Sequence, residues 1–376
     1  MSRGPGIRAG LLAACLLISE PFAARAADPS RQVVDSTPQV VDSTSQTADS
    51  PVVRATGPAS GPHSPQGLQY GLVIAGLGGE KKYVDRNLAW ALGFYDVLNS
   101  DHGFSEDRLT LLVEDPAAAG GQPAVKSTLE EIQGALSALA RLVRPEDDLF
   151  ILLIGHGSAT GTGARLNIPG PDLTAGMLRD ALEEIRGRYT VVINGASSSA
   201  PFIDALSGPR RVIVTATKSG SERLSTVFPE HLLASLTEEA GDLDKNGRVS
   251  VLESFVYAKN KTAEWYAGQG LLATEHPLLD DNGDGRGSRE PGPGGTDGVL
   301  AGRVHFGRRS IPALTTGSPG ERSLRARMEE LRVSIDELKA TKDRLDPEEY
   351  AALMENLLIE LARASRQLRT LGENPP

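Results

Sequence analysis

The sequence predicts an α/β fold in which helices cover both faces of a mostly parallel sheet. Short apolar runs bounded by Gly, Asp and Asn alternate along the chain with longer amphipathic segments. Continuous apolar runs are typical of strands buried on both faces, and strands that alternate with helices are typical of parallel sheets. In such sheets, functional side chains gather at the carboxyl ends of the strands.

Five apolar runs are the predicted strands: residues 72–75, 109–113, 149–154, 191–193 and 212–216. Apolar residues recur with helical spacing in the segments between them, which are the predicted helices: residues 84–98, 127–143 and 175–186. Each crossover through a helix returns the chain for the next parallel strand. The globular part therefore begins near Leu68.

The composition excludes several classes of protein. The 376 residues include 49 Asp and Glu against 39 Lys and Arg, which gives a net charge of −10. Nucleic acid is therefore not an expected partner, because its binders need clustered positive charge. No run approaches the roughly 20 apolar residues that span a bilayer, so no transmembrane segment is expected. A single cysteine, Cys15, excludes disulfides within the chain and Cys-based zinc sites.

The first residues have the features of an export signal. Basic residues precede an apolar run over residues 9–18, and a small-x-small cleavage site ends at Ala26. We therefore expect residues 1–26 to be a signal peptide and the protein to be periplasmic or extracellular. Two alternatives stay open: a buried N-terminal helix, or a lipoprotein anchored at Cys15.

The segment over residues 27–66 is predicted to be a disordered tether. It is rich in Ser, Thr, Pro and Asp and contains a degenerate repeat that begins Gln-Val-Val-Asp-Ser-Thr. Such a composition buries too little apolar surface to offset the entropy lost on ordering.

The segment over residues 311–376 is predicted to form a helical hairpin. Two apolar stripes with three- and four-residue spacing are Leu324, Met328, Leu331, Ile335 and Leu338, then Leu353, Leu357 and Leu361. Asp346 and Pro347 separate them, and Pro347 suits the first turn of the second helix. The stripes fit either packing within the chain or self-association through these helices.

Two of the predicted strands end in residues that can carry chemistry. Gly155-His156-Gly157 follows one strand, and Ala196-Ser197-Ser198-Ser199 follows the next. Small residues at such a turn let a nucleophile and backbone N–H groups face an open edge. Adjacent strands would bring His156 and Ser197 close together.

The order and spacing of these two motifs resemble those of a known protein family. A strand ending in Gly-His-Gly, followed one helix and one strand later by Ala-Cys-x-Ser-Gly and a short helix, is the pattern of caspase-like cysteine peptidases. The chain resembles the legumain-like and bacterial caspase-like members over roughly residues 68–240. The resemblance implies a caspase-like α/β domain, taken as residues 67–228. His156 matches the family histidine, and Ser197 stands where the family has its catalytic cysteine.

The exchange of cysteine for serine bears directly on activity. A thiol of pKa about 8.5 forms a usable thiolate beside a histidine, whereas a serine needs a closely bonded base that a third group orients. We therefore expect a pseudo-peptidase that lacks cysteine-protease chemistry, with a peptide or protein as its substrate or ligand. Two alternatives stay open: a serine-dependent hydrolase that uses Ser197 and His156, or a non-catalytic peptide-binding or scaffold module.

The most specific local motif runs from residue 242 to residue 253. Its oxygen donors stand at loop positions one, three, five, seven, nine and twelve: Asp242, Asp244, Asn246, Arg248 through its carbonyl, Ser250 and Glu253. Glycine at position six allows the sharp turn of an EF-hand loop. Amphipathic runs over residues 229–240 and 251–266 flank the loop, so the sequence predicts an EF-hand-type calcium site.

A second acidic loop follows with the same opening, Asp-x-Asn-x-Asp-Gly. Its candidate ligands are Asp280, Asn282, Asp284 and Arg286. Glu290 falls one residue short of the twelfth position, so a non-helical calcium loop, a loop that pairs with the first one, or an ordinary solvated turn fits. The two loops together define a predicted calcium-binding region over residues 229–310.

Overall fold

The computed structural model describes residues 67–161, 163–292, 295–307, 318–340 and 345–373. The predicted signal peptide over residues 1–26 and the predicted tether over residues 27–66 lie outside the described residues, as does Cys15.

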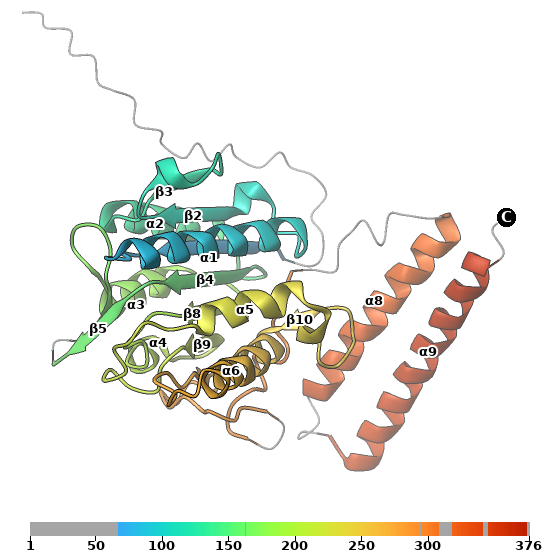
Figure 1. The fold of residues 1–376 in the computed structure, drawn as a ribbon. Coiled ribbons are helices and arrows are strands. Elements are labelled where there is room, and N and C mark those ends of the chain that lie inside the picture. Colours follow the sequence, from blue (N-terminus) through green and yellow to red (C-terminus); the bar gives the residue numbers. More distant parts are fainter. Residues whose placement is uncertain (1–66, 162, 293–294, 308–317, 341–344, 374–376) are drawn as a thin grey trace, which may run out of the picture. The chain divides into compact units, whose positions relative to one another are not determined.

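A mixed, mostly parallel sheet forms the centre of the fold, as predicted (Figure 1). Its seven described strands lie in the order β11-β9-β8-β4-β1-β2-β3, and only the β11–β9 pairing among them is antiparallel. The strands are β1 (Gln69–Ala75), β2 (Leu109–Val113), β3 (Ala124–Lys126), β4 (Asp148–Ile154), β8 (Tyr189–Asn194), β9 (Arg211–Thr215) and β11 (Leu278–Asp280). All five predicted strands are present, whereas β3 and β11 were not predicted.

Helices cover both faces of this sheet, and the three predicted helices are among them. They are α1 (Lys81–Ser100), α2 (Leu129–Leu142), α3 (Ala175–Glu184), α4 (Phe202–Leu206), α5 (Phe228–Thr237) and α6 (Val251–Gly268). Threonine side chains at residues 128 and 174 cap the N-termini of α2 and α3. These caps satisfy backbone N–H groups that the first helical turn leaves free.

Alternate residues of each strand enter two separate apolar cores. Val73 and Phe150 pack with side chains of α1, α5 and α6 on one face. Leu72 and Ile151, their neighbours in sequence, pack with α2, α3 and α4 on the other. Because successive strand residues point to opposite faces, a continuous apolar run supplies both cores.

Short elements outside the central sheet were not predicted. Three strands form a small antiparallel sheet, and two more form a ribbon: β5 (Gly157–Thr160), β6 (Gly163–Leu166) and β7 (Leu173–Thr174), then β10 (Val249–Ser250) and β12 (His305–Phe306). Single 3-10 turns are η1 (Glu106–Arg108), η2 (Pro116–Ala118) and η3 (Glu239–Gly241). At two to four residues, these elements are too short to show a periodic pattern.

Two C-terminal helices, α8 (Pro319–Ala340) and α9 (Pro347–Glu373), contact each other. Leu331, Ile335 and Ala364 are buried. Arg327 of α8 forms a 2.7 Å ion pair with Glu360 of α9. This contact fits packing of the stripes within the chain. No helix in the described ranges is both long and apolar enough to cross a membrane.

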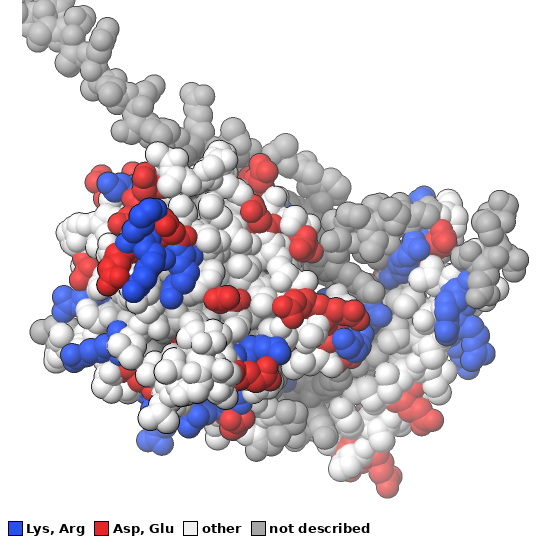
Figure 2. Space-filling view, viewed as in Figure 1, with Lys and Arg blue, Asp and Glu red and all other residues white. Residues whose placement is uncertain are grey.

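Charges of both signs lie side by side on the face shown in Figure 2. Lys and Arg side chains there have Asp and Glu side chains among them instead of forming one continuous basic surface. The absence of a nucleic-acid partner stays a prediction.

Candidate functional site

Between β1 and β4 the order in which the chain adds strands to the sheet reverses, and the carboxyl ends of these two strands lie side by side. The chain adds β2 and β3 on one side of β1 and then returns to add β4 on the other side. In parallel α/β sheets, ligands bind in the crevice at such a switch point. Gly155, with φ 141°, follows β4 there and lies against the backbone of Gly76, which follows β1.

His156 is half-buried at this edge. Its ring meets the ring of Tyr83 edge-on, with 5.1 Å between the centroids. Burial and then the charge of Arg86 lower the pKa of His156, against the opposing effect of a hydrogen bond to the backbone of Gly78. The imidazole is therefore neutral at neutral pH, the state in which it can accept a proton.

Ser197 follows β8, the strand beside β4, and its hydroxyl turns toward the backbone of Gly157. Ser197 Oγ accepts a hydrogen bond from Gly157 N at 3.2 Å and donates one to Gly157 O at 3.4 Å. Within the described residues, no hydrogen bond joins the side chains of Ser197 and His156. Ser197 is only 2% exposed, so it is enclosed at this edge of the sheet.

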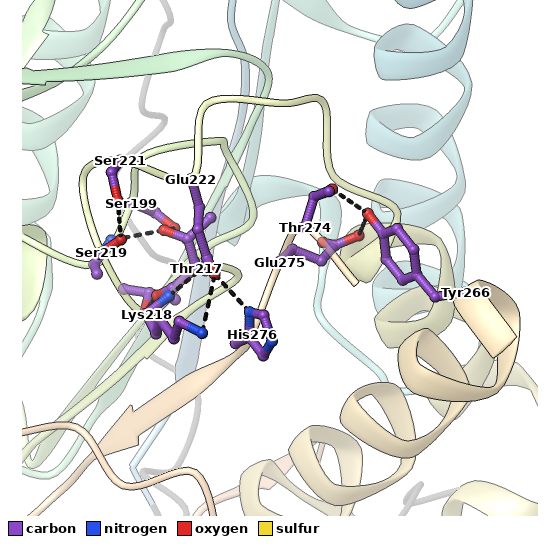
Figure 3. A network of polar contacts seen from close by, with 12 residues as sticks. Ser199, Thr217, Lys218, Ser219, Ser221, Glu222, Tyr266, Thr274, Glu275 and His276 are labelled. Atoms are coloured by element: carbon purple, nitrogen blue, oxygen red, sulfur yellow. Dashed lines mark hydrogen bonds and ion pairs between the residues drawn. The ribbon is translucent and has the colours of Figure 1, made fainter. Parts of the chain in front are cut away.

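The turn after Ser197 is hydrogen-bonded to the segment that follows β9 (Figure 3). Ser199 Oγ lies 3.1 Å from Thr217 Oγ1 and accepts a hydrogen bond from Thr217 N at 3.2 Å. Ser198, between Ser197 and Ser199 in the chain, has φ 54°, and its buried hydroxyl has no hydrogen-bond partner among the described residues. A left-handed conformation costs a residue of this type about 1–2 kcal/mol. The turn is thus strained and held by its neighbours.

Glu222 connects this turn to the segment before β11 (Figure 3). Its backbone oxygen accepts a hydrogen bond from Ser198 N at 2.7 Å. Its carboxylate lies 2.5 Å from His276 Nδ1 and accepts a hydrogen bond from Lys218 N at 2.8 Å. An acid and a histidine distant in sequence therefore support the turn that carries Ser197.

Glu275 is buried at the N-terminus of α5, where it accepts backbone hydrogen bonds from Val227 at 2.7 Å and Phe228 at 3.2 Å. Tyr266 donates a further hydrogen bond at 3.2 Å. Burial raises the pKa of Glu275 to about 7, although these hydrogen bonds and the charge of Arg86 act to lower it. Glu275 therefore titrates in the physiological range.

Sequence reasoning missed Glu275 and the Glu222–His276 pair. The contacts of Glu275 with α5 and of Glu222 with His276 span 47 to 54 residues along the chain. No local spacing could have identified these contacts.

The loop between α5 and α6 brings together three predicted metal ligands. Single carboxylate oxygens of Asp242, Asp244 and Glu253 all lie within 4.8 Å of one another. Two oxygens that bind one calcium ion, each at 2.3–2.6 Å, are at most about 5 Å apart. This partly buried cluster could therefore hold a metal ion.

Backbone N–H groups orient the first half of the loop. Asp242 accepts hydrogen bonds from the N–H groups of Asn246 at 3.0 Å and Gly247 at 2.7 Å. Asn246 Oδ1 accepts a hydrogen bond from Arg248 N at 2.9 Å, so these predicted ligands share one turn. Gly247 has φ 83°, the left-handed region that glycine enters most readily.

Glu253 closes the loop and begins α6 in a capping box. Its carboxylate accepts hydrogen bonds from Ser250 N at 2.8 Å and Ser250 Oγ at 2.7 Å, while Ser250 Oγ accepts one from Glu253 N. Its other oxygen accepts a hydrogen bond from Asp244 N at 3.0 Å. The helix start thus fixes the twelfth-position carboxylate beside the other ligands.

The second acidic loop also forms a turn, directly after β11. Asn282 Oδ1 accepts a hydrogen bond from Asp284 N, and Asp284 Oδ1 accepts one from Arg286 N, both at 2.8 Å. Glu290 instead forms an ion pair with Lys259 at 2.6 Å.

No protein-family model matches the chain, and no curated protein matches it significantly. The fold and the acidic cluster define an α/β protein with a candidate metal centre, without a family assignment.

Proposed function

We propose that this protein is an exported, calcium-binding, peptidase-like protein whose caspase-like domain does not cleave peptides. The observation that carries the proposal is the position of the Ser197 hydroxyl, which bonds to Gly157 and is enclosed. A serine becomes nucleophilic only when a base accepts its proton during attack. With its hydroxyl held by backbone, Ser197 lacks that arrangement with His156.

Calcium is the cation that we propose for residues 242–253. The donor set consists of carboxylate, amide, hydroxyl and carbonyl oxygens, which suit a hard cation. The one-three-five-seven-nine-twelve spacing favours calcium over magnesium, because calcium accepts more ligands and a bidentate carboxylate. Its role would be structural, since an ion that binds only the native state stabilises the fold.

A peptide-cleavage assay tests the absence of catalysis. The full-length protein, Ser197→Ala and Ser197→Cys are incubated with a mixed peptide library, with and without calcium. We expect no cleavage by the wild type or the alanine variant, and cleavage by the cysteine variant because a thiolate tolerates looser geometry. Ser221→Cys, which places a thiol at an exposed position, controls for nonspecific thiol chemistry. Wild-type cleavage that Ser197→Ala abolishes would contradict the proposal.

Serine-dependent hydrolysis is the second candidate, and the lowered pKa of His156 favours it. A neutral imidazole in the turn after β4, the strand beside β8, could act as a general base if the Ser197 hydroxyl left Gly157. Peptide binding by the wild type without cleavage would instead favour a non-catalytic binding module. Equilibrium binding of the same library to Ser197→Ala, read together with cleavage by the wild type, separates these outcomes, because a hydrolase both binds and cleaves whereas a binding module only binds.

A further inference from the structure

We propose that residues 280–286 form a second divalent-cation site, built on the buried carboxylate of Asp280. Asp280 is 1% exposed, and its Oδ1 accepts a hydrogen bond from Gly283 N at 3.2 Å. Its Oδ2 is buried and has no hydrogen-bond partner among the described residues. A buried carboxylate oxygen without a partner is costly, and a bound cation supplies the missing interaction.

Further oxygen donors follow Asp280 at alternate positions. Asn282 and Asp284 provide side-chain oxygens, and Arg286 provides a carbonyl, which repeats the one-three-five-seven spacing of the first loop. Backbone N–H groups engage Asn282 Oδ1 and one oxygen of Asp284, which orients both side chains. The site holds two carboxylates and an amide, compared with three carboxylates in the first loop. Water would complete the coordination of a calcium ion.

Negative charge accumulates around this loop. Asp297 is 1% exposed, and burial is the main cause that raises its pKa, followed by the charges of Asp281, Asp280 and Asp284. Asp281 is not counted as a ligand of the proposed site, because both of its carboxylate oxygens accept backbone hydrogen bonds, from Gly298 and Ala301. A divalent cation beside Asp280 would offset the repulsion among these acids.

The loop is held against the connection between α4 and β9. Gly285 N donates a hydrogen bond to Ser207 Oγ at 3.0 Å. A side chain at Gly283 would come within 3.2 Å of the Gly208 backbone, so the loop lies close to that connection. The proposed site is therefore attached to the central α/β fold, whereas the first loop joins α5 to α6. The inference does not depend on the proposed function of either the first loop or Ser197.

Counting bound ions tests the second site. Chelator-treated full-length protein is titrated with calcium chloride by isothermal calorimetry, and the bound ions are counted by native mass spectrometry. We expect two ions per wild-type chain, one in Asp280→Asn, one in Asp284→Ala, one in Glu253→Gln and none in Asp284→Ala combined with Glu253→Gln. Asp115→Ala is the matched control, because Asp115 is also exposed and also accepts an N–H two residues onward. It should bind two ions.

The outcomes separate the two loops. Two ions retained in both Asp280→Asn and Asp284→Ala would overturn the second site, as would a wild type whose one ion is lost in Glu253→Gln. A wild type with one ion that is lost in Asp284→Ala and kept in Glu253→Gln would support the second site while rejecting the first. Circular dichroism checks the folding of each variant. Should Asp280→Asn not fold, the exposed Asp284→Ala decides.

Discussion

The carboxylate of Glu275 accepts the backbone N–H of Val227 at 2.7 Å, so an acid just before β11 caps the start of α5 from 48 residues away. Helix N-termini favour negative charge, whereas burial disfavours it. Burial dominates, since the pKa of Glu275 rises to about 7.

Stability should therefore depend on pH through Glu275. Its pKa rises from 4.5 in the unfolded chain to about 7 in the fold, so the native state holds a proton that the unfolded state has lost. The stabilisation is complete below the unfolded value and disappears as pH rises through about 7. Urea denaturation should show the free energy of unfolding falling by up to about 1.4 kcal/mol per pH unit within this window.

Glu275→Gln should flatten that slope because it removes the titrating group. Glu230→Gln is the matched control, since Glu230 is an exposed acid in the first turn of the same helix. It should keep the wild-type slope. An unchanged slope in Glu275→Gln would show that another group titrates.

Calcium should stabilise the fold through Glu253. For an affinity of about 10⁻⁴–10⁻³ M, 10 mM calcium adds about 1.4–2.7 kcal/mol to the free energy of unfolding. Glu253→Gln should lose the part of this gain that the first loop contributes and keep any part from the second loop, yet unfold like the wild type in chelator, because glutamine also fits a capping box. Thermal melts with and without chelator check this, and Glu264→Gln on the same helix should retain the full shift.

The ion pair between Arg188 and Asp148 should contribute measurably to stability. Arg188 Nε and a terminal nitrogen contact both oxygens of Asp148, whose side chain is 3% exposed. Arg188→Ala leaves that carboxylate without its partner. Because the Arg188 side chain is 45% exposed and water can enter, we expect a loss of about 1–2 kcal/mol in denaturant unfolding.

Arg179→Ala provides the comparison, because the Arg179–Asp180 pair is exposed on both sides. Exposed pairs contribute about 0–1 kcal/mol, so this variant should stay close to the wild type. Equal losses in the two variants would argue against a special role for the Asp148 pair.

Ser198→Gly should stabilise the turn after β8. Glycine adopts φ 54° without the steric penalty of a side chain, and the substitution removes a buried hydroxyl that has no partner within the described chain. These gains exceed the extra entropy of glycine in the unfolded chain, about 0.4–1 kcal/mol. We expect a net gain of about 0.5–2 kcal/mol in thermal or urea unfolding. Ser198→Ala should gain less, because it keeps the left-handed strain.

The central sheet was predictable because its strands are buried on both faces. Residues 149–154, for example, form a continuous apolar run, and the strand there spans Asp148–Ile154. Strand β11 was not predictable, because three residues carry no pattern and their antiparallel pairing depends on where α6 returns the chain.

The same distinction applies to the candidate sites. The loop over residues 242–253 was predictable, because its ligands follow a fixed local spacing and the structure brings Asp242, Asp244 and Glu253 together. The enclosure of Ser197 was not, because it depends on Gly157, 40 residues away, lying beside the hydroxyl. Local patterns predict local sites, and long-range packing decides how accessible they are.

Strand β1 has a mechanical consequence. It pairs with β4 along its whole length and with β2 over Gly71 to Ile74, so both of its edges are occupied. A pulling force applied at Gly67 in the direction of the strand would act across its hydrogen bonds and would load both ladders in shear. The bonds would then have to break together instead of opening one after another. In a single-molecule pulling experiment, where the unfolding rate governs resistance, this end of the domain should withstand more load than a peripheral strand would.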